Sequence, residues 1–174
     1  SDAAMKQKLF VATIFGFASL LSFSAGAAEA WKGKPPGGEF LFGFGGGISQ
    51  LGSLGGVPLI GNVAAKIVHL GFVPDMNNQV WIEAAGGVHL TFNGGFTSGL
   101  FSTHLRWDFV KDDYWTFFAV GGVGGAVISV AGLTSYIIHP RFGVGGVYYF
   151  LPQMGVRLDL SHEWMTLGLQ VQLP

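Results

Sequence analysis

Residues 154–164 read MGVRLDLSHEW, and apolar side chains occupy nearly every second position of this stretch. In an extended strand, successive side chains point to opposite faces, so a period of two gives one apolar face and one polar face. The apolar face carries Met154, Val156, Leu158, Leu160 and Trp164, and the polar face carries Gly155, Arg157, Asp159, Ser161 and Glu163. This pattern predicts a strand with apolar surroundings on one side and charged surroundings on the other.

The same period of two recurs along much of the remaining chain, most clearly in residues 80–92, 101–109 and 136–150. Other stretches have the composition of strands but alternate less regularly. Short turns separate these segments, one of them near Met165, and one longer connection is expected at 49–60. Eight strands are predicted, at 40–48, 62–73, 79–92, 101–109, 114–130, 136–150, 154–164 and 166–173.

The composition indicates that something other than water solvates much of the surface. Hydrophobic residues make up 49% of the chain and charged residues only 11%, whereas an average soluble chain is roughly 25% charged. Beyond the N-terminal segment, no uninterrupted apolar run reaches the length of about 18 residues that a transmembrane helix needs. In hydrocarbon, only helices and closed barrels satisfy every backbone N–H and C=O. The sequence therefore predicts an all-β fold, an antiparallel up-and-down transmembrane β-barrel of about eight strands.

Charge and cysteine content argue against a nucleic-acid partner and exclude disulfides and thiolate metal sites. The formal net charge is −1, which provides no basic face for nucleic acid. The chain has no cysteine, so it holds neither disulfides nor thiolate metal sites.

The N-terminal segment is typical of a secretory signal peptide. A basic start at Lys6 and Lys8 precedes an apolar core, residues 9–23, and a run of small residues that suits a signal-peptidase site. Residues ahead of Met5 are interpreted as vector-derived, and the alternative for the whole segment is an uncleaved apolar helix. The predicted divisions are 1–30 for these residues plus the signal peptide, 31–38 for a Gly/Pro leader, and 39–174 for the barrel.

An even number of strands places both ends of the barrel on the same, periplasmic side of the membrane. The turns expected at 74–78, 111–113 and 151–153 then lie on that side. Aromatic residues gather within a few positions of these turns, and amphipathic rings prefer the headgroup level of a membrane. The gathered residues are Trp81, Trp107, Phe109, Tyr114, Trp115, Tyr148, Tyr149 and Phe150, which predicts an aromatic girdle.

Charged side chains share the inward face of the predicted strands. An eight-stranded barrel is just wide enough to be filled by its own side chains, so paired charges are expected to plug the interior. The alternative is an ion or proton pathway gated by arginine–carboxylate pairs. The network is predicted to comprise Glu83, His104, Arg106, Asp108, Arg141, Arg157, Asp159 and Glu163. Three inward histidines, His89, His104 and His139, lie on different strands without local ligand spacing, so neither a metal site nor a cofactor is expected.

The Arg-x-Asp patterns at Arg106/Asp108 and Arg157/Asp159, together with the alternating strands and the terminal strand 167–173, resemble small outer-membrane barrels of the OmpA transmembrane-domain type. The resemblance covers the predicted barrel and is architectural. It implies a protein of the bacterial outer membrane whose partner is outer-membrane lipid. A structural or assembly role is the leading functional expectation, and a narrow, porin-like ion channel is the alternative.

Ser161, His162 and Glu163 are similar to the serine, histidine and glutamate of outer-membrane lipid A deacylases, which would make the chain a lipid-modifying enzyme. Adjacent residues of a strand point to opposite faces, so Ser161 and His162 would not meet as nucleophile and base. The His-x-Ser-Asn pattern of that family is absent, and so is a Gly-x-Ser-x-Gly elbow. No enzyme activity and no catalytic residue are therefore expected.

Small residues on the outward face of the barrel predict association with further copies of the chain. Such residues let backbones approach closely inside a membrane, so a homo-oligomer is expected, for example a ring that encloses lipid or a central opening. The alternative is that the glycines ease the curvature of the barrel. With even-numbered positions taken as outward, the contact residues are Ala84, Gly86, Gly122, Gly124, Ala126 and Gly146.

Two features fit a regular barrel poorly. Pro140 falls inside a predicted strand, and its missing N–H requires either a bulge or a position at the end of the barrel. The glycine pairs 121–122 and 124–125 indicate a bulge or a close approach of two backbones.

Overall fold

The computed structural model describes residues 31–35, 37–51, 54–92, 97–130 and 133–174, so the predicted signal peptide lies outside the described residues. The described residues contain no helix that is both long and apolar enough to cross a membrane. The strands are β1 (Phe40–Leu51), β2 (Leu54–Val68), β3 (Asn78–Thr91), β4 (Thr97–Val110), β5 (Trp115–Val130), β6 (Leu133–Leu151), β7 (Met154–Ser161) and β8 (Trp164–Leu173).

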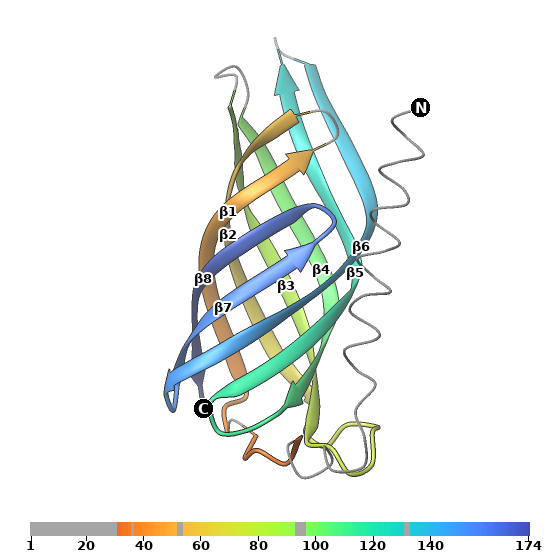
Figure 1. Cartoon of the computed structure of the whole chain (residues 1–174). Coiled ribbons are helices and arrows are strands. Elements are labelled where there is room, and N and C mark those ends of the chain that lie inside the picture. Colours follow the sequence, from red (N-terminus) through yellow and green to blue (C-terminus); the bar gives the residue numbers. More distant parts are fainter. Residues whose placement is uncertain (1–30, 36, 52–53, 93–96, 131–132) are drawn as a thin grey trace, which may run out of the picture. The chain divides into compact units, whose positions relative to one another are not determined.

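These eight strands form one closed barrel (Figure 1). Each strand pairs antiparallel with its neighbours in sequence, and β8 closes the barrel by pairing with β1 from Phe40↔Leu173 to Ser49↔Trp164. Closure provides hydrogen-bond partners on both sides of the terminal strands, which an open sheet would leave unpaired. The predicted antiparallel up-and-down barrel of eight strands is confirmed.

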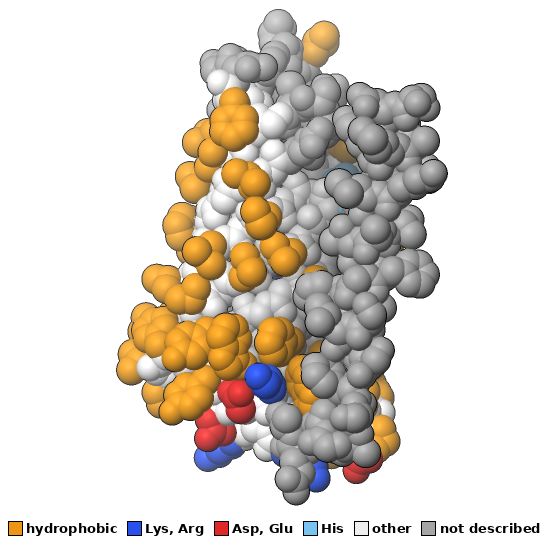
Figure 2. Space-filling view, viewed as in Figure 1, with side chains coloured by type: hydrophobic (Ala, Val, Ile, Leu, Met, Phe, Trp, Pro, Cys, Tyr) orange, Lys and Arg blue, Asp and Glu red, His pale blue; other side chains and the backbone are white. Residues whose placement is uncertain are grey.

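We call the end of the barrel that carries Glu39 and Pro174 the base, and the opposite end, where the β1–β2, β3–β4, β5–β6 and β7–β8 hairpins turn, the rim. In Figure 2 the visible charged side chains gather at the base, while apolar side chains cover the flank. At the base, the ring of Trp115 stacks on that of Phe117 and lies 5.0 Å from that of Tyr148. Not every ring of the predicted girdle faces outward, because Trp81 and Tyr149 are buried.

One predicted connection is wrong, and another is shifted by a few residues. Residues 49–60 belong mostly to β1 and β2 and not to a loop. Pairing between these strands outweighs the tendency of their glycines and of Pro58, which is buried, to form a loop. The tight turn predicted near Met165 lies at 162–163, between β7 and β8, and Met165 itself pairs with Leu160.

Neighbouring strands differ greatly in length near the rim. β6 has 19 residues and β7 has 8, and their pairing ends at Gly143↔Ser161. Beyond that point β6 continues to pair with β5 as far as Leu133, so within the described residues 133–142 have a strand partner on one side only. Pro140 lies in this segment, where one side of β6 has no strand partner in any case. The pairing of β6 with β5 continues past Pro140 without a shift of register. The β5–β6 hairpin therefore extends beyond the β7–β8 turn (Figure 1).

Candidate functional site

Glu83 of β3 occupies the centre of the barrel interior. It is fully buried, and its two carboxylate oxygens accept hydrogen bonds of 2.7 and 2.9 Å from Arg157 of β7. Two residues of β4 complete its surroundings, with His104 Nε2 at 3.1 Å and Arg106 Nη1 at 3.4 Å. A buried carboxylate is costly unless such partners surround it. Glu83 therefore joins opposite sides of the interior.

Towards the base, the network continues through Arg106. Its Nε and Nη2 donate to Asp108 at 2.6 and 2.9 Å, and its Nη1 donates to Gln170 of β8 at 2.6 Å. Gln170 in turn donates to the hydroxyl of Tyr149 at 2.8 Å. One guanidinium thus connects β4 with β3 and β8, and every one of its polar nitrogens has a partner.

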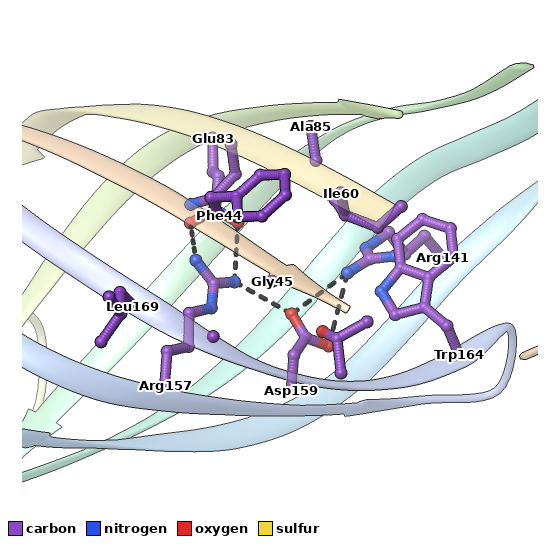
Figure 3. Close-up of a pocket in the computed structure, with 13 residues that line it drawn as sticks. Phe44, Gly45, Ile60, Glu83, Ala85, Arg141, Arg157, Asp159, Trp164 and Leu169 are labelled. Atoms are coloured by element: carbon purple, nitrogen blue, oxygen red, sulfur yellow. Dashed lines mark hydrogen bonds and ion pairs between the residues drawn. The ribbon is translucent and has the colours of Figure 1, made fainter. Parts of the chain in front are cut away.

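Towards the rim, guanidinium and carboxylate groups alternate. Arg157 Nη2 donates to Asp159 at 2.9 Å, and Asp159 lies 3.3 Å from Arg141 of β6. Arg141 Nη1 donates to Glu163 at 2.8 Å. Figure 3 shows Asp159 between the two arginines, and Arg157 between Glu83 and Asp159. The structure thus places all eight residues of the predicted network in the interior and joins them in one set of contacts.

Aromatic rings fill the space beside the guanidinium groups. Phe118 of β5 lies between Arg106 and Arg157, whose Cζ atoms are 4.3 and 4.8 Å from the ring centroid. The ring of Trp164 lies 4.0 Å from Arg141 Cζ. A cation over a ring face is attracted by the ring quadrupole. The ring of Phe118 fits because its partner on β6 is Gly145, where a Cβ would overlap the ring.

The space left in this part of the interior is small. A cavity of about 20 Å³ lies beside Glu83, Arg141 and Arg157 (Figure 3). A buried water needs a cavity of about 10–15 Å³. The cavity therefore has room for one water and does not form a passage for hydrated ions.

Three of the six predicted oligomer contacts point into the barrel, which corrects their assignment to the outward face. Gly122 pairs with His104, an inward residue, and cross-strand partners share a face. A Cβ at Gly124 would meet Glu163, and Ala126 is fully buried. The registers of β5 with both neighbours run without a shift, so its glycines mark close backbone approach and not a bulge.

The other three predicted contacts are on the outward face. Ala84 and Gly86 are exposed on β3, and Gly146 of β6 is half-buried beside the ring of Phe117. Gly86 pairs with Gly61 of β2, which puts two glycines side by side on the outer surface.

A second cluster lies at the rim, where His139, His162 and Glu163 converge. His139 Nδ1 lies 2.8 Å from Glu163 Oε1, and the two imidazole ring centroids are 5.3 Å apart. All the potential ligand atoms lie within 4.8 Å of one another. The sequence did not reveal this cluster because, of the three histidines that were considered, His89, His104 and His139, the fold brings His139 alone into the cluster within the described residues.

The geometry at Ser161 weakens the hydrolase alternative. Its hydroxyl donates to the carbonyl of Trp164 at 3.0 Å and accepts from the backbone N–H of the same residue at 3.2 Å. The hydroxyl therefore closes the β7–β8 turn, and it faces a backbone group instead of an imidazole that could activate it.

Comparison with known proteins identifies the fold alone. No family model matches the chain, and no curated protein matches its sequence. Among solved structures, Ail, the attachment invasion locus protein of Yersinia pestis, is similar with a TM-score of 0.51 and 13% identity over 78% of this chain and 99% of that chain. Ail in complex with the heparin analogue sucrose octasulfate gives the same TM-score with 12% identity and the same coverage.

Neisserial surface protein A is similar to the same degree. Its TM-score is 0.51, with 10% identity over 77% of this chain and 96% of that chain. These neighbours are small eight-stranded outer-membrane barrels. The fold of the chain is therefore that of the small outer-membrane β-barrels, as the resemblance in the sequence implied.

Proposed function

We propose that this chain is an integral protein of the bacterial outer membrane that has a structural or assembly role and does not conduct ions. The observation that carries the proposal is a barrel with an apolar outer surface and an interior filled by paired charges. Such a protein acts through its outer surface and its two ends.

The outer surface supports the membrane location. Outward side chains of every strand include exposed large apolar residues, for example Phe44, Leu105, Val123 and Leu169. β8 has 10 residues, which at the usual tilt and rise span about 25 Å, the height of the apolar band of such barrels. Among the described residues, the exposed lysine and aspartate side chains, Lys32, Lys34, Asp75 and Asp113, all lie at the base.

The interior argues against the channel alternative. Arg106, Arg157 and Glu83 each have at least two charged partners, and the pair of Glu83 with Arg157 crosses the lumen. The cavity beside them has room for one water. An ion that crossed this region would have to break pairs whose members are then left buried and uncompensated.

The outer surface also supports self-association. Gly61 and Gly86 lie between Phe44 and Phe101, because the registers place these four residues in one row across β1 to β4. The two glycines leave a shallow strip between two exposed rings, and Ala84 extends it along β3. In a membrane, packing at such small residues drives association. We therefore propose a second copy of the chain as the partner of this strip.

We do not propose that this chain binds sulfated polyanions, as Ail does in its complex with the heparin analogue. A polyanion needs a basic surface. Among the described residues, the exposed cations Lys32 and Lys34 lie at the base, and Arg141, the arginine nearest the rim, is buried.

A conductance measurement tests the proposed function. The refolded chain is expected to insert into planar bilayers without producing current steps, with a general porin in the same membranes as the positive control. Insertion is checked by protease protection of the barrel in matching vesicles. Regular unitary currents from inserted protein would favour the channel, and failure to insert would reject the membrane location.

A further inference from the structure

We infer that His139, His162 and Glu163 form a binding site for one divalent transition-metal ion of the zinc class at the rim. The inference does not depend on the structural role proposed above. It rests on the placement of three potential ligands, on a carboxylate oxygen that lacks a hydrogen bond, and on the charge of the interior.

The fold brings the three ligands together from two segments. His139 lies on the part of β6 that extends beyond β7, and His162 and Glu163 form the turn between β7 and β8. Consecutive residues of a strand diverge, but these two lie in a tight turn, and their side chains converge on His139. The potential ligand atoms all lie within 4.8 Å of one another. Two imidazoles and one carboxylate are a set that zinc uses in proteins when it keeps a fourth position open.

One carboxylate oxygen of Glu163 accepts a hydrogen bond, and the other accepts none. Its side chain is only 6% exposed, and Arg141 donates to Oε2 at 2.8 Å. Oε1 is buried and has no hydrogen bond, although His139 Nδ1 lies 2.8 Å away. Arg141 is itself fixed by Asp159 and by the ring of Trp164. Outer partners of this kind orient the ligands of metal sites.

Gly124 keeps the space around these ligands open. A Cβ at this position would lie 2.5 Å from Glu163 Oε1 and 3.3 Å from His139 Cε1. A cavity of about 10 Å³ adjoins His139 and Glu163 and is also lined by Ser49, whose buried hydroxyl lacks a hydrogen-bond partner. Leu100 and Trp164 form apolar walls of this cavity, which has room for a small ion or one water.

The charge of the interior favours a cation at this place. The network contains four carboxylates, of Glu83, Asp108, Asp159 and Glu163, but only three guanidinium groups, of Arg106, Arg141 and Arg157. One negative charge is thus left over when the histidines are neutral. Glu163 is the network carboxylate nearest the outside, because the side chain of His139 beside it is 24% exposed and His162 is exposed. An ion can reach this end of the network without passing the buried pairs.

The ligand types select the class of ion. Imidazole nitrogen suits Zn²⁺, Cu²⁺ and Ni²⁺, whereas Ca²⁺ and Mg²⁺ require several oxygen ligands. Arg141 contributes a positive charge close to Glu163, and the carboxylates of Asp159 and Glu163 offset it. A divalent ion at this site would connect the unpaired part of β6 to the β7–β8 turn.

The test is a titration of the folded barrel with Zn²⁺ alone. The full chain, refolded in detergent micelles, is titrated by calorimetry, and one Zn²⁺ is expected to bind per chain. Each of His139→Ala and His162→Ala should weaken binding at least about tenfold, since even outer-shell changes weaken metal sites by about that factor or more. Ca²⁺ and Mg²⁺ should not bind. Co²⁺ should give the visible absorption of a tetrahedral nitrogen and oxygen site.

His69→Ala is the matched control. His69 is also exposed and lies 3.1 Å from a carboxylate, that of Glu39, but it belongs to no cluster of three potential ligands among the described residues. Its removal should leave Zn²⁺ affinity unchanged. A heat-dependent shift in gel mobility confirms that each variant is folded. Unchanged affinity in folded His162→Ala, an equal loss in His69→Ala, or no binding by the parent chain would each overturn the site.

Discussion

Arg157 donates hydrogen bonds to both carboxylate oxygens of Glu83, although the two residues are 74 positions apart and belong to strands that do not pair. The contact therefore crosses the lumen, and it ties β7 to β3. Because both groups are buried, each depends on the other for compensation of its charge.

We expect Glu83 and Arg157 to be strongly coupled in stability. Glu83→Gln or Arg157→Met alone should each cost about 3–5 kcal/mol, because a charged partner is left buried, while the double variant should cost less than the sum. Denaturant unfolding followed by tryptophan fluorescence measures the three free energies. Strictly additive losses would show that the contact does not couple the two residues.

Gly145 and Gly146 are neighbours in sequence with opposite surroundings. A Cβ at Gly145 would overlap the ring of Phe118 and a carbonyl of β7, whereas a Cβ at Gly146 would make ordinary contacts with Phe117. Gly145→Val should therefore destabilise the barrel by at least about 1–3 kcal/mol, and Gly146→Val should have a much smaller effect. Unfolding midpoints compare the two variants. Equal midpoints would contradict the inward placement of Gly145.

The rim part of β6 should exchange its amide hydrogens faster than the base part. Residues 133–142 pair with β5 alone, whereas 143–148 pair with β5 and β7, and exchange follows the local free energy of opening. Hydrogen exchange of the barrel in micelles, resolved by residue, measures the difference. Uniform protection along β6 would mean that the free edge is covered, for example by another copy.

Self-association should depend on the strip at Gly61 and Gly86. Gly86→Leu should dissociate the oligomer without unfolding it, because a leucine would fill the close-packing surface. Gly121→Leu is the matched control, since Gly121 is on β5 with nothing within 4 Å of an added Cβ. Native mass measurement in mild detergent separates the outcomes. A parent chain that is monomeric, or a control that dissociates equally, would reject the strip as an interface.

The sequence was sufficient to predict the barrel and to place the eight predicted network residues on its inward face, whereas Gln170 and Tyr149, which extend the network, were not among them. Arginine and aspartate at alternate positions of β4 and β7 mark the inward face, because charges cannot face hydrocarbon. The partners within the network could not be predicted, since the contact between Glu83 and Arg157 depends on the stagger of strands around the closed barrel. Alternation along one strand does not contain that information.

The wrong assignments have identifiable causes. β5 is apolar on both faces, so the alternation of its side chains does not show which face points into the barrel. Gly122 and Gly124 were therefore assigned to the outward face, although they point inward. The pairing of Val110 with Thr116 across the β4–β5 turn fixes that direction, but the pairing is visible only in the structure. The cluster at His162 was missed because the expected strand extended through the turn, where the rule that adjacent residues diverge no longer holds.

The difference in length between β6 and β7 affects the surrounding lipid. β7 and β8 are short, so the barrel wall beside them is only about as high as the apolar layer of a thin membrane. On β6, the exposed side chains of Tyr136, Ile138 and Phe142 extend the apolar surface further towards the rim. A bilayer of uniform thickness cannot match both sides at once, and hydrophobic mismatch is relieved by tilting of the protein or by local changes in lipid height. The barrel should therefore stand inclined in the membrane, with the leaflet near the rim thinned beside the β7–β8 turn and thickened beside the β5–β6 hairpin.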